Sequence, residues 1–166
     1  MSICVQLQIV RRRTLEALPR TLGARVTRSA AMAHLKTYIV EDSPVIRENL
    51  IATLEEMVPL EVIGTADDES TATHWLKRPD NGCDLVIIDI FLKSGSGLGV
   101  LQAARSTGQP CKLVVLSNYA TPDMRRKCLQ LGADKVFDKS NEIDGLISYC
   151  SRLATGEGDT VSGALS

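Results

Sequence analysis

The chain has few aromatic residues and few histidines. Aromatic side chains make up only 4% of its 166 residues, and there are two histidines, His34 and His74. The sequence contains no CxxC pair, and no cysteine–histidine group has the spacing of a structural zinc site. No apolar run approaches the roughly 20 residues that a membrane-spanning helix needs. These absences argue against a zinc module, and we expect no membrane partner.

The chain also has little net charge. Nineteen basic and 20 acidic side chains give a formal charge of −1, which argues against a general nucleic-acid binder, so we expect no nucleic-acid partner. The balance is uneven along the chain. Residues 1–33 hold six arginines and one glutamate, whereas residues 34–166 hold 13 basic and 19 acidic side chains. The body of the protein is therefore acidic and follows a basic leader.

The cysteines are odd in number and widely spaced, at positions Cys4, Cys83, Cys111, Cys128 and Cys150. This pattern favours small buried thiols over a disulfide framework. Thiols persist in reducing compartments, so we expect a cytoplasmic protein.

The composition predicts one domain between two extensions. Residues 1–33 lack periodicity, and we expect a disordered basic extension there; a transit peptide and a start codon assigned too early, with Met32 as the alternative start, are the other interpretations. Residues 155–166 are small, polar and glycine-containing, which predicts a flexible tail. The domain is expected over residues 34–154. Because only about a dozen residues follow it, we expect a protein without a second, output domain.

Hydrophobic runs and helical periodicities alternate through residues 34–154. Strands are predicted at 36–40, 60–66, 84–89, 112–117 and 134–139, and helices at 43–57, 68–78, 97–106, 121–132 and 142–153. This alternation predicts an α/β fold with a mostly parallel sheet. The first, third and fourth strands are the most continuously apolar, as central strands should be, which favours a flavodoxin-like, doubly wound sheet of order 2-1-3-4-5.

Polar residues stand where these strands end. Glu41 and Asp42 follow the first strand, and Asp89, Ser117 and Lys139 end the third, fourth and fifth. Carboxyl ends of parallel strands meet at one edge, so we expect these side chains to converge. Close carboxylates repel one another, and a Mg²⁺ ion with oxygen ligands would relieve that repulsion. Asp89, beside a metal and Lys139, then fits a nucleophile toward a phosphoryl group.

Four segments resemble the receiver domain of bacterial two-component response regulators, which has a CheY-like fold. They are YIVEDSPVIR, VIIDIFLKSGSG, VVLSNYA and GADKVFDKS, in the family's order and spacing across residues 35–154. The resemblance implies that Asp89 accepts phosphate from a sensor histidine kinase. It also implies that Mg²⁺ is ligated by Asp42, Asp89 and the Phe91 backbone carbonyl, with Glu41 acting through water.

The resemblance further implies a switch and an output surface. Ser117 would move to the phosphoryl oxygen, Phe137 would turn inward, and Lys139 would pair with Asp89 and then with the phosphate. An effector or a histidine phosphotransfer protein would bind the face formed by helix 121–132, strand 134–139 and helix 142–153. A phosphorylation-dependent homodimer is a further possible partner. Such a domain assists its own phosphorylation and dephosphorylation but is no separate enzyme.

The sequence departs from the family pattern in the loops around the site. Lys93 stands where proline is usual, which predicts a looser loop after Asp89. Asn118 replaces a small residue. Ser140 follows Lys139 in place of proline, and because a cis bond before a non-proline residue costs about 2.5–4 kcal/mol, we expect a trans bond there. Phe91 and Tyr119 stand two residues beyond Asp89 and Ser117, where both could shield a phosphoryl group from water.

Two other functions compete with this interpretation. A degenerate receiver would act only as a docking or dimerisation module, which the complete set of polar residues disfavours. A haloacid-dehalogenase-like phosphatase would also use an aspartate after an apolar strand with Mg²⁺. That family needs a second aspartate two residues later, where this chain has Phe91, and a cap domain for which the chain is too short.

Overall fold

The computed structural model describes residues 34–157, so the expectations for residues 1–33 and for the end of the tail lie outside it. The strands are β1 (Leu35–Val40), β2 (Leu60–Ala66), β3 (Leu85–Ile88), β4 (Lys112–Ser117) and β5 (Lys135–Asp138). The helices are α2 (Pro44–Met57), α3 (Glu69–Leu76), α4 (Gly97–Ser106), α5 (Pro122–Gln130) and α6 (Ile143–Ala154). Strands and helices alternate as the sequence predicts, with bounds that differ by a few residues.

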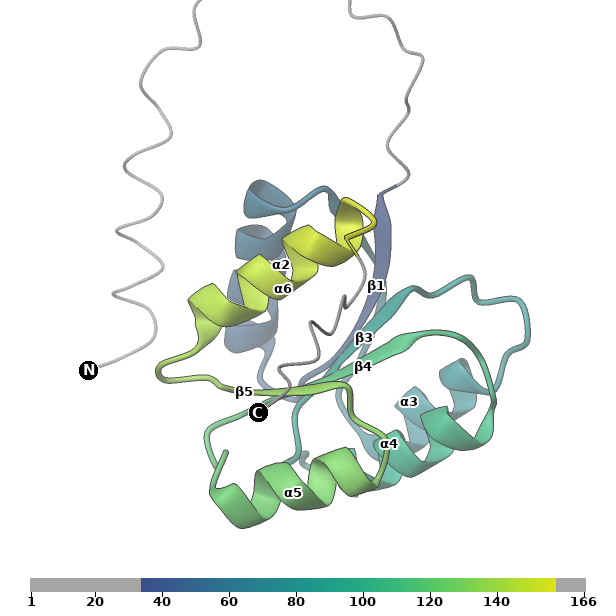
Figure 1. Cartoon of the computed structure of the whole chain (residues 1–166). Helices are drawn as coiled ribbons and strands as arrows, with labels where there is room; N and C mark the ends of the chain where they lie inside the picture. The colour runs from purple at the N-terminus through teal and green to yellow at the C-terminus, as the bar shows by residue number, and fades with distance from the viewer. Residues whose placement is uncertain (1–33, 158–166) are drawn as a thin grey trace, which may run out of the picture. The chain divides into compact units, whose positions relative to one another are not determined.

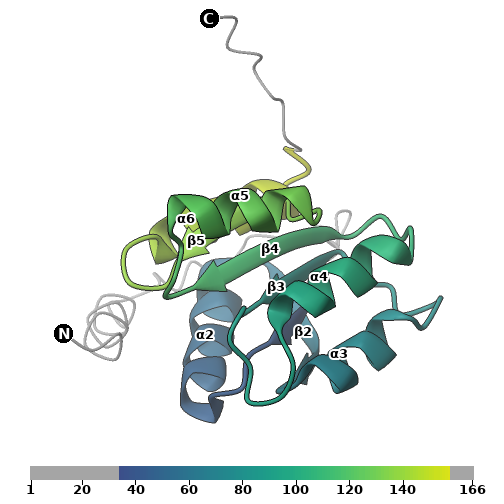
Figure 2. The same ribbon diagram turned by 90° about the horizontal axis from the view of Figure 1, so that it is seen from below.

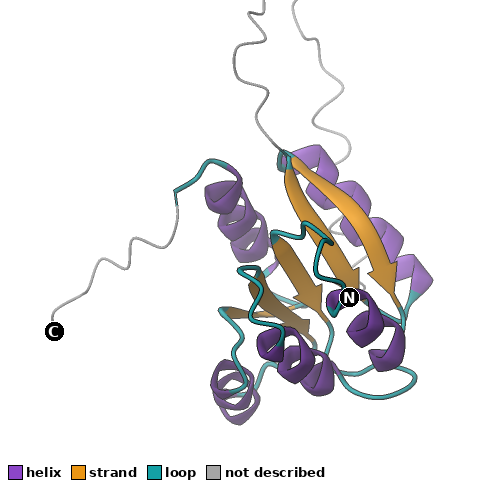
Figure 3. Ribbon diagram, turned by 90° about the vertical axis from the view of Figure 1, so that its right-hand side faces the viewer, coloured by secondary structure: helices purple, strands orange, loops and turns teal. Residues whose placement is uncertain are grey.

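The five strands form one parallel sheet in the order β2-β1-β3-β4-β5, which confirms the predicted order (Figures 1 and 3). β1 lies between β2 and β3, with Thr37 opposite Leu85 and Val40 opposite Ile88. The chain winds outward to β2 first and then returns past β1 to β3. The two strands whose carboxyl ends bear the predicted carboxylates are therefore neighbours.

Helices cover both faces of the sheet, and each face has its own apolar core (Figures 1 and 2). Alternate residues of each central strand point to opposite faces, so Val86 and Ile88 pack toward α3, α4 and α5, whereas Leu85 and Ile87 pack toward α2 and α6. β3 is buried on both faces, which explains its uninterrupted apolar sequence.

Helix starts follow from local capping chemistry. Ser43 and Thr121 precede α2 and α5, and their side chains accept hydrogen bonds from the Ile46 and Met124 amides. Gly132 follows α5 with φ of +104°, a conformation that glycine adopts without a Cβ penalty. No helix within residues 34–157 has the length and apolar content to cross a membrane.

Candidate functional site

The backbone ladder continues past the strand ends and fixes the first residues of the site. The Glu41 amide donates to the Ala66 carbonyl at 2.9 Å, and the Asp89 amide donates to the Val40 carbonyl at 2.9 Å. The Lys139 amide donates to the Ser117 carbonyl at 3.1 Å. Because these residues stay in register, their side chains project from the same edge of the sheet.

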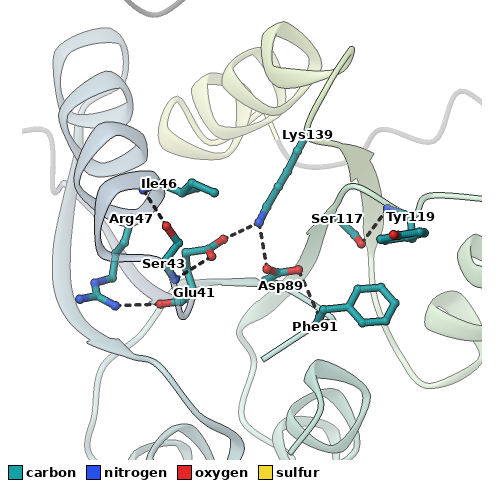
Figure 4. Close-up of polar contacts among 9 residues, drawn as sticks. All are labelled: Glu41, Ser43, Ile46, Arg47, Asp89, Phe91, Ser117, Tyr119 and Lys139. Carbon is teal, nitrogen blue, oxygen red and sulfur yellow. Dashed lines mark hydrogen bonds and ion pairs between the residues drawn. The ribbon is translucent and has the colours of Figure 1, made fainter. Parts of the chain in front are cut away.

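Lys139 lies between two buried carboxylates (Figure 4). Its Nζ is 2.5 Å from Glu41 Oε2 and 2.9 Å from Asp89 Oδ2. The lysine side chain is 4% exposed, that of Glu41 is 3% exposed and that of Asp89 is 10% exposed. A buried charge is costly unless it is paired. Lys139, Glu41 and Asp89 therefore depend on one another to remain charged in the interior.

Burial and ion pairing together shift the pKa values of Glu41 and Lys139. Burial raises the pKa of the Glu41 carboxyl above its ordinary value, and the hydrogen bond and charge of Lys139 offset that rise only in part. Burial by itself would lower the pKa of Lys139, but the Asp89 charge and the hydrogen bonds to Glu41 and Asp89 outweigh it, so the pKa of the ammonium is raised. Lys139 therefore stays charged at neutral pH.

Three carboxylates gather beside this lysine. Ligand oxygens of Glu41, Asp42 and Asp89 all lie within 4.8 Å of one another. Glu41 and Asp89 are buried and Asp42 is half-buried, so one side of the cluster faces solvent. Carboxylates on one solvent-accessible side suit Mg²⁺, which takes few protein oxygens and keeps several waters. The donor set therefore fits the predicted ion.

Neighbouring groups hold the acidic residues in place. The Ser43 amide donates to Glu41 Oε1 at 3.1 Å, and Arg47 Nη1 donates to the Glu41 carbonyl at 2.8 Å (Figure 4). The Phe91 amide donates to Asp89 Oδ1 at 3.3 Å. Each carboxyl oxygen of Asp89 therefore accepts a hydrogen bond. Arg47, which follows the acidic pair in the sequence, holds the backbone of Glu41.

The loop after Asp89 approaches the start of α4 closely. The Gly97 amide donates to the Ile90 carbonyl at 2.9 Å. A Cβ at position 97 would lie 2.1 Å from the Asp89 carbonyl oxygen, which is shorter than any van der Waals contact. Glycine is required here because the backbone of α4 packs directly against the backbone of Asp89.

Ser117 and two aromatic residues lie on the other side of Asp89 from Glu41 (Figure 4). Ser117 is fully buried, and its Oγ accepts a hydrogen bond from the Tyr119 amide at 3.1 Å. The rings of Phe91 and Tyr119 form an edge-to-face pair with centroids 4.9 Å apart, and both are more than half exposed. An aromatic pair therefore stands on the solvent side of Asp89 and Ser117.

Phe137, the predicted switch aromatic, lies apart from the acidic cluster. It is half-buried in the core between the sheet and α6, with its ring centroid 6.0 Å from that of Tyr149. Gly145 of α6 leaves room for the ring, because a Cβ there would lie 3.2 Å from it. Its switching role, like the Ser117 movement, stays a prediction.

Two contacts around the loop were not predicted from the sequence. Lys93 pairs with Asp67 at 2.5 Å, which joins this loop to the β2–α3 connection through two exposed side chains; the expected looser loop stays a prediction. Glu69 Oε2 accepts a hydrogen bond from the Ser96 amide at 2.7 Å. The glycines at 95 and 99 leave the space for Glu69, but no sequence pattern identified that partner. The peptide before Ser140 is trans, as expected.

Comparisons with known proteins identify a family and agree with the fold. The family model described as the response regulator receiver domain matches residues 37–151. A probable transcriptional regulatory protein of Picosynechococcus sp. is 32% identical over 145 residues, which cover 84% of this chain and 55% of that protein. Thus the chain spans about half the length of that curated relative.

Solved structures show the same fold. The signal receiver domain of a response regulator, NarL, from Mycobacterium tuberculosis matches with a TM-score of 0.65 and 24% identity, covering 74% of this chain and 98% of that one. A response regulator from Burkholderia pseudomallei, solved with a phosphorylated aspartic acid and a calcium ion, matches with a TM-score of 0.60 and 17% identity over 74% of this chain and 69% of that one.

Proposed function

Since this chain belongs to the response regulator receiver domain family, we propose that it accepts a phosphoryl group on Asp89 from the phosphohistidine of a sensor histidine kinase. The observation that carries the proposal is the position of Asp89, held by Lys139 at 2.9 Å within the cluster of three carboxylates. The phosphorylated aspartic acid of the Burkholderia pseudomallei regulator is consistent with it.

Transfer replaces one bond to phosphorus by another. A carboxylate oxygen of Asp89 attacks the phosphorus, and the nitrogen–phosphorus bond of phosphohistidine breaks. The imidazole nitrogen leaves with the bonding electrons and takes a proton from water. Lys139 is already in contact with Asp89, so its ammonium can follow the charge as it passes from the carboxylate to the phosphoryl oxygens.

The acidic residues would hold Mg²⁺ for this step. Asp42, Asp89 and the Phe91 carbonyl would ligate the ion directly, and Glu41 would act through water. When bound, the ion supplies positive charge that reduces repulsion between the carboxylates and the incoming phosphoryl group. Ser117 would donate its hydroxyl proton to a phosphoryl oxygen; its Oγ accepts from the Tyr119 amide, which leaves that proton available.

We further propose that the signal leaves through the face formed by α5, β5 and α6. Arg125 ties this face together, because it donates to the Val136 carbonyl at 3.0 Å and pairs with Glu142 at 2.8 Å. The partner would be an effector or a histidine phosphotransfer protein, and a phosphorylation-dependent homodimer would use the same face. Direct binding of nucleic acid by residues 34–157 is not expected from their acidic charge.

The matched stretches cover only 55% and 58% of two curated relatives, so the output activities of those longer proteins are not assigned to this chain. A cytoplasmic location is also proposed. Its support is that Cys83, Cys111, Cys128 and Cys150 are free thiols, as in a reducing compartment. The described domain would assist its own phosphorylation and dephosphorylation, without acting on a separate substrate.

Labelling with a small-molecule phosphodonor tests the assignment. The full chain should take up one phosphoryl group with Mg²⁺ and none with a chelator, and Asp89→Asn should remain unlabelled. Asp144→Asn is the matched control, because Asp144 is exposed on the first turn of α6. Labelling that survives Asp89→Asn would refute the assignment, and a wild-type chain that takes up no phosphate would favour a docking module.

The phosphatase alternative has little support at its second acid position. Phe91 occupies that position, and its exposed ring packs against Tyr119. A phosphatase would release phosphate from a small phosphomonoester with turnover, whereas the proposed receiver would not use such a donor.

A further inference from the structure

Glu69, at the first turn of α3, holds the loop that follows the phosphoacceptor. Its amide donates to the Ser94 carbonyl at 3.1 Å, and its Oε2 accepts from the Ser96 amide at 2.7 Å. These bonds lie on either side of Gly95. Glu69, a residue of α3, therefore holds the loop through the residues on both sides of Gly95. Figures 1 and 2 show α3 and α4 side by side on one face of the sheet.

Two glycines leave the space that the Glu69 side chain fills. A Cβ at Gly95, whose φ is +78°, would lie 2.4 Å from the Glu69 Cβ. A Cβ at Gly99 would lie 2.1 Å from Glu69 Oε1. The carboxylate thus lies in a backbone hollow that no larger residue would permit at either position.

The held residue, Ser96, is the bridge partner of Phe91. Phe91 and Ser96 form an isolated antiparallel bridge, closed on one side by the hydrogen bond from the Gly97 amide to the Ile90 carbonyl. A bridge fixes the peptide planes of both partners relative to each other. The hydrogen bond from Ser96 to Glu69 therefore also constrains Phe91, the residue whose carbonyl is the proposed backbone ligand of the ion.

We propose that Glu69 is a positioning residue that orients the Phe91 carbonyl toward the metal through the Ser96 amide. The inference rests on the proposed function, since it concerns the same metal site. Groups that orient metal ligands typically change metal affinity about tenfold or more when they are removed, even though they never touch the ion. Through the same contacts, metal binding at Phe91 would alter the position of Glu69 and so of the first turn of α3.

The test measures the Mg²⁺ dissociation constant of the full chain by isothermal titration calorimetry. Glu69→Ala should weaken Mg²⁺ binding about tenfold, because the acceptor for the Ser96 amide is lost. Glu69→Gln removes the charge and one acceptor oxygen but keeps a carbonyl oxygen for the Ser96 amide, so it should retain most of the affinity. Glu48→Ala, an exposed change on α2, is the matched control and should bind Mg²⁺ like the wild type.

Equal weakening by Glu69→Gln and Glu69→Ala would show a simple charge effect and overturn the inference, as would a Glu69→Ala chain with wild-type affinity. Both outcomes leave the proposed function intact. A wild-type chain that binds no Mg²⁺ would instead contradict the proposed function, and the inference with it. Amide exchange at Ser96, followed by NMR without metal, should accelerate in Glu69→Ala, and unchanged exchange would also overturn the inference.

A second variant tests the same contact from the other side. Gly99→Ala places a methyl group where Glu69 Oε1 lies, and the flexible carboxylate should move away. Mg²⁺ affinity should then fall in the wild-type background but not in the Glu69→Ala background, where the hollow is empty. An equal loss in both backgrounds would show that Gly99→Ala acts on α4 itself and would contradict the role of Glu69.

Discussion

Lys139→Met tests how strongly the buried ion pairs hold the fold together. Methionine keeps the length of the side chain but removes an ammonium that lies 2.5 Å from Glu41 and 2.9 Å from Asp89. Breaking a buried pair by removing one partner costs about 3–5 kcal/mol, because the other charge stays buried and unpaired. Asp89 keeps 10% exposure and the Phe91 amide, so we expect the lower value, about 3 kcal/mol.

The assay is urea unfolding of the full chain at neutral pH with a chelator present. Without Lys139, the carboxylates of Glu41 and Asp89 stay buried and unpaired, and Glu41→Gln removes one of these charges. The double variant Lys139→Met/Glu41→Gln should therefore be more stable, by about 1–3 kcal/mol, than the sum of the two single changes predicts. Because burial raises the pKa of Glu41, its proton is retained more readily in the folded state. The loss of unfolding free energy caused by Lys139→Met should therefore become smaller as the pH falls toward 4.5, the ordinary pKa of a glutamate, and larger as the pH rises above it.

Divalent cations provide the control for this prediction. Added Mg²⁺ should restore part of the stability of Lys139→Met, because an ion bound to the folded state stabilises it by mass action. A loss of stability below about 1 kcal/mol, together with additive behaviour of the double variant, would show that the buried charges do not depend on one another.

Three further predictions follow from the described residues. Gly97→Ala would place a Cβ 2.1 Å from the Asp89 carbonyl oxygen, so the free energy of unfolding should fall by about 3 kcal/mol and phosphodonor labelling should drop; a stable, fully labelled variant would contradict this. Phe91→Ala and Tyr119→Ala should each shorten the lifetime of the phosphorylated form, since the exposed ring pair would otherwise limit access of water, and unchanged decay would reject the shield. Burial raises the pKa of the Cys150 thiol from 9.0 to about 12, so as the pH rises the unfolded chain loses this proton before the folded chain does. The free energy of unfolding should therefore fall by about 1.4 kcal/mol per pH unit between these two values. In Cys150→Ala, the free energy of unfolding measured from pH 8 upward should fall less steeply with pH.

The fold could be predicted because its signals are local. Apolar runs of strand length, capping residues such as Ser43 and Thr121, and a glycine at a helix end each specify an element without knowledge of its neighbours. The sheet order followed from which strands are apolar on both faces. Helix faces follow less directly from the sequence: Met57 lies three residues after the buried Leu54 in α2, yet it is 44% exposed.

The site could be predicted as a set of residues but not as a set of contacts. Strand ends in a parallel sheet share an edge, so Glu41, Asp42, Asp89, Ser117 and Lys139 follow from topology. That Lys139 contacts Glu41 as well as Asp89 depends on side-chain geometry and burial. The hydrogen bond from Ser96 to Glu69 joins residues 27 apart in the chain, and its only trace in the sequence is the room left by Gly95 and Gly99.

The decisive experiment on Asp89 is a crystal structure of the full chain grown with Mg²⁺ and beryllofluoride, a mimic of the phosphoryl group. We expect the beryllofluoride on a carboxyl oxygen of Asp89, with one ion ligated by Asp42, Asp89 and the Phe91 carbonyl. An unmodified Asp89, or an ion bound away from these oxygens, would contradict it.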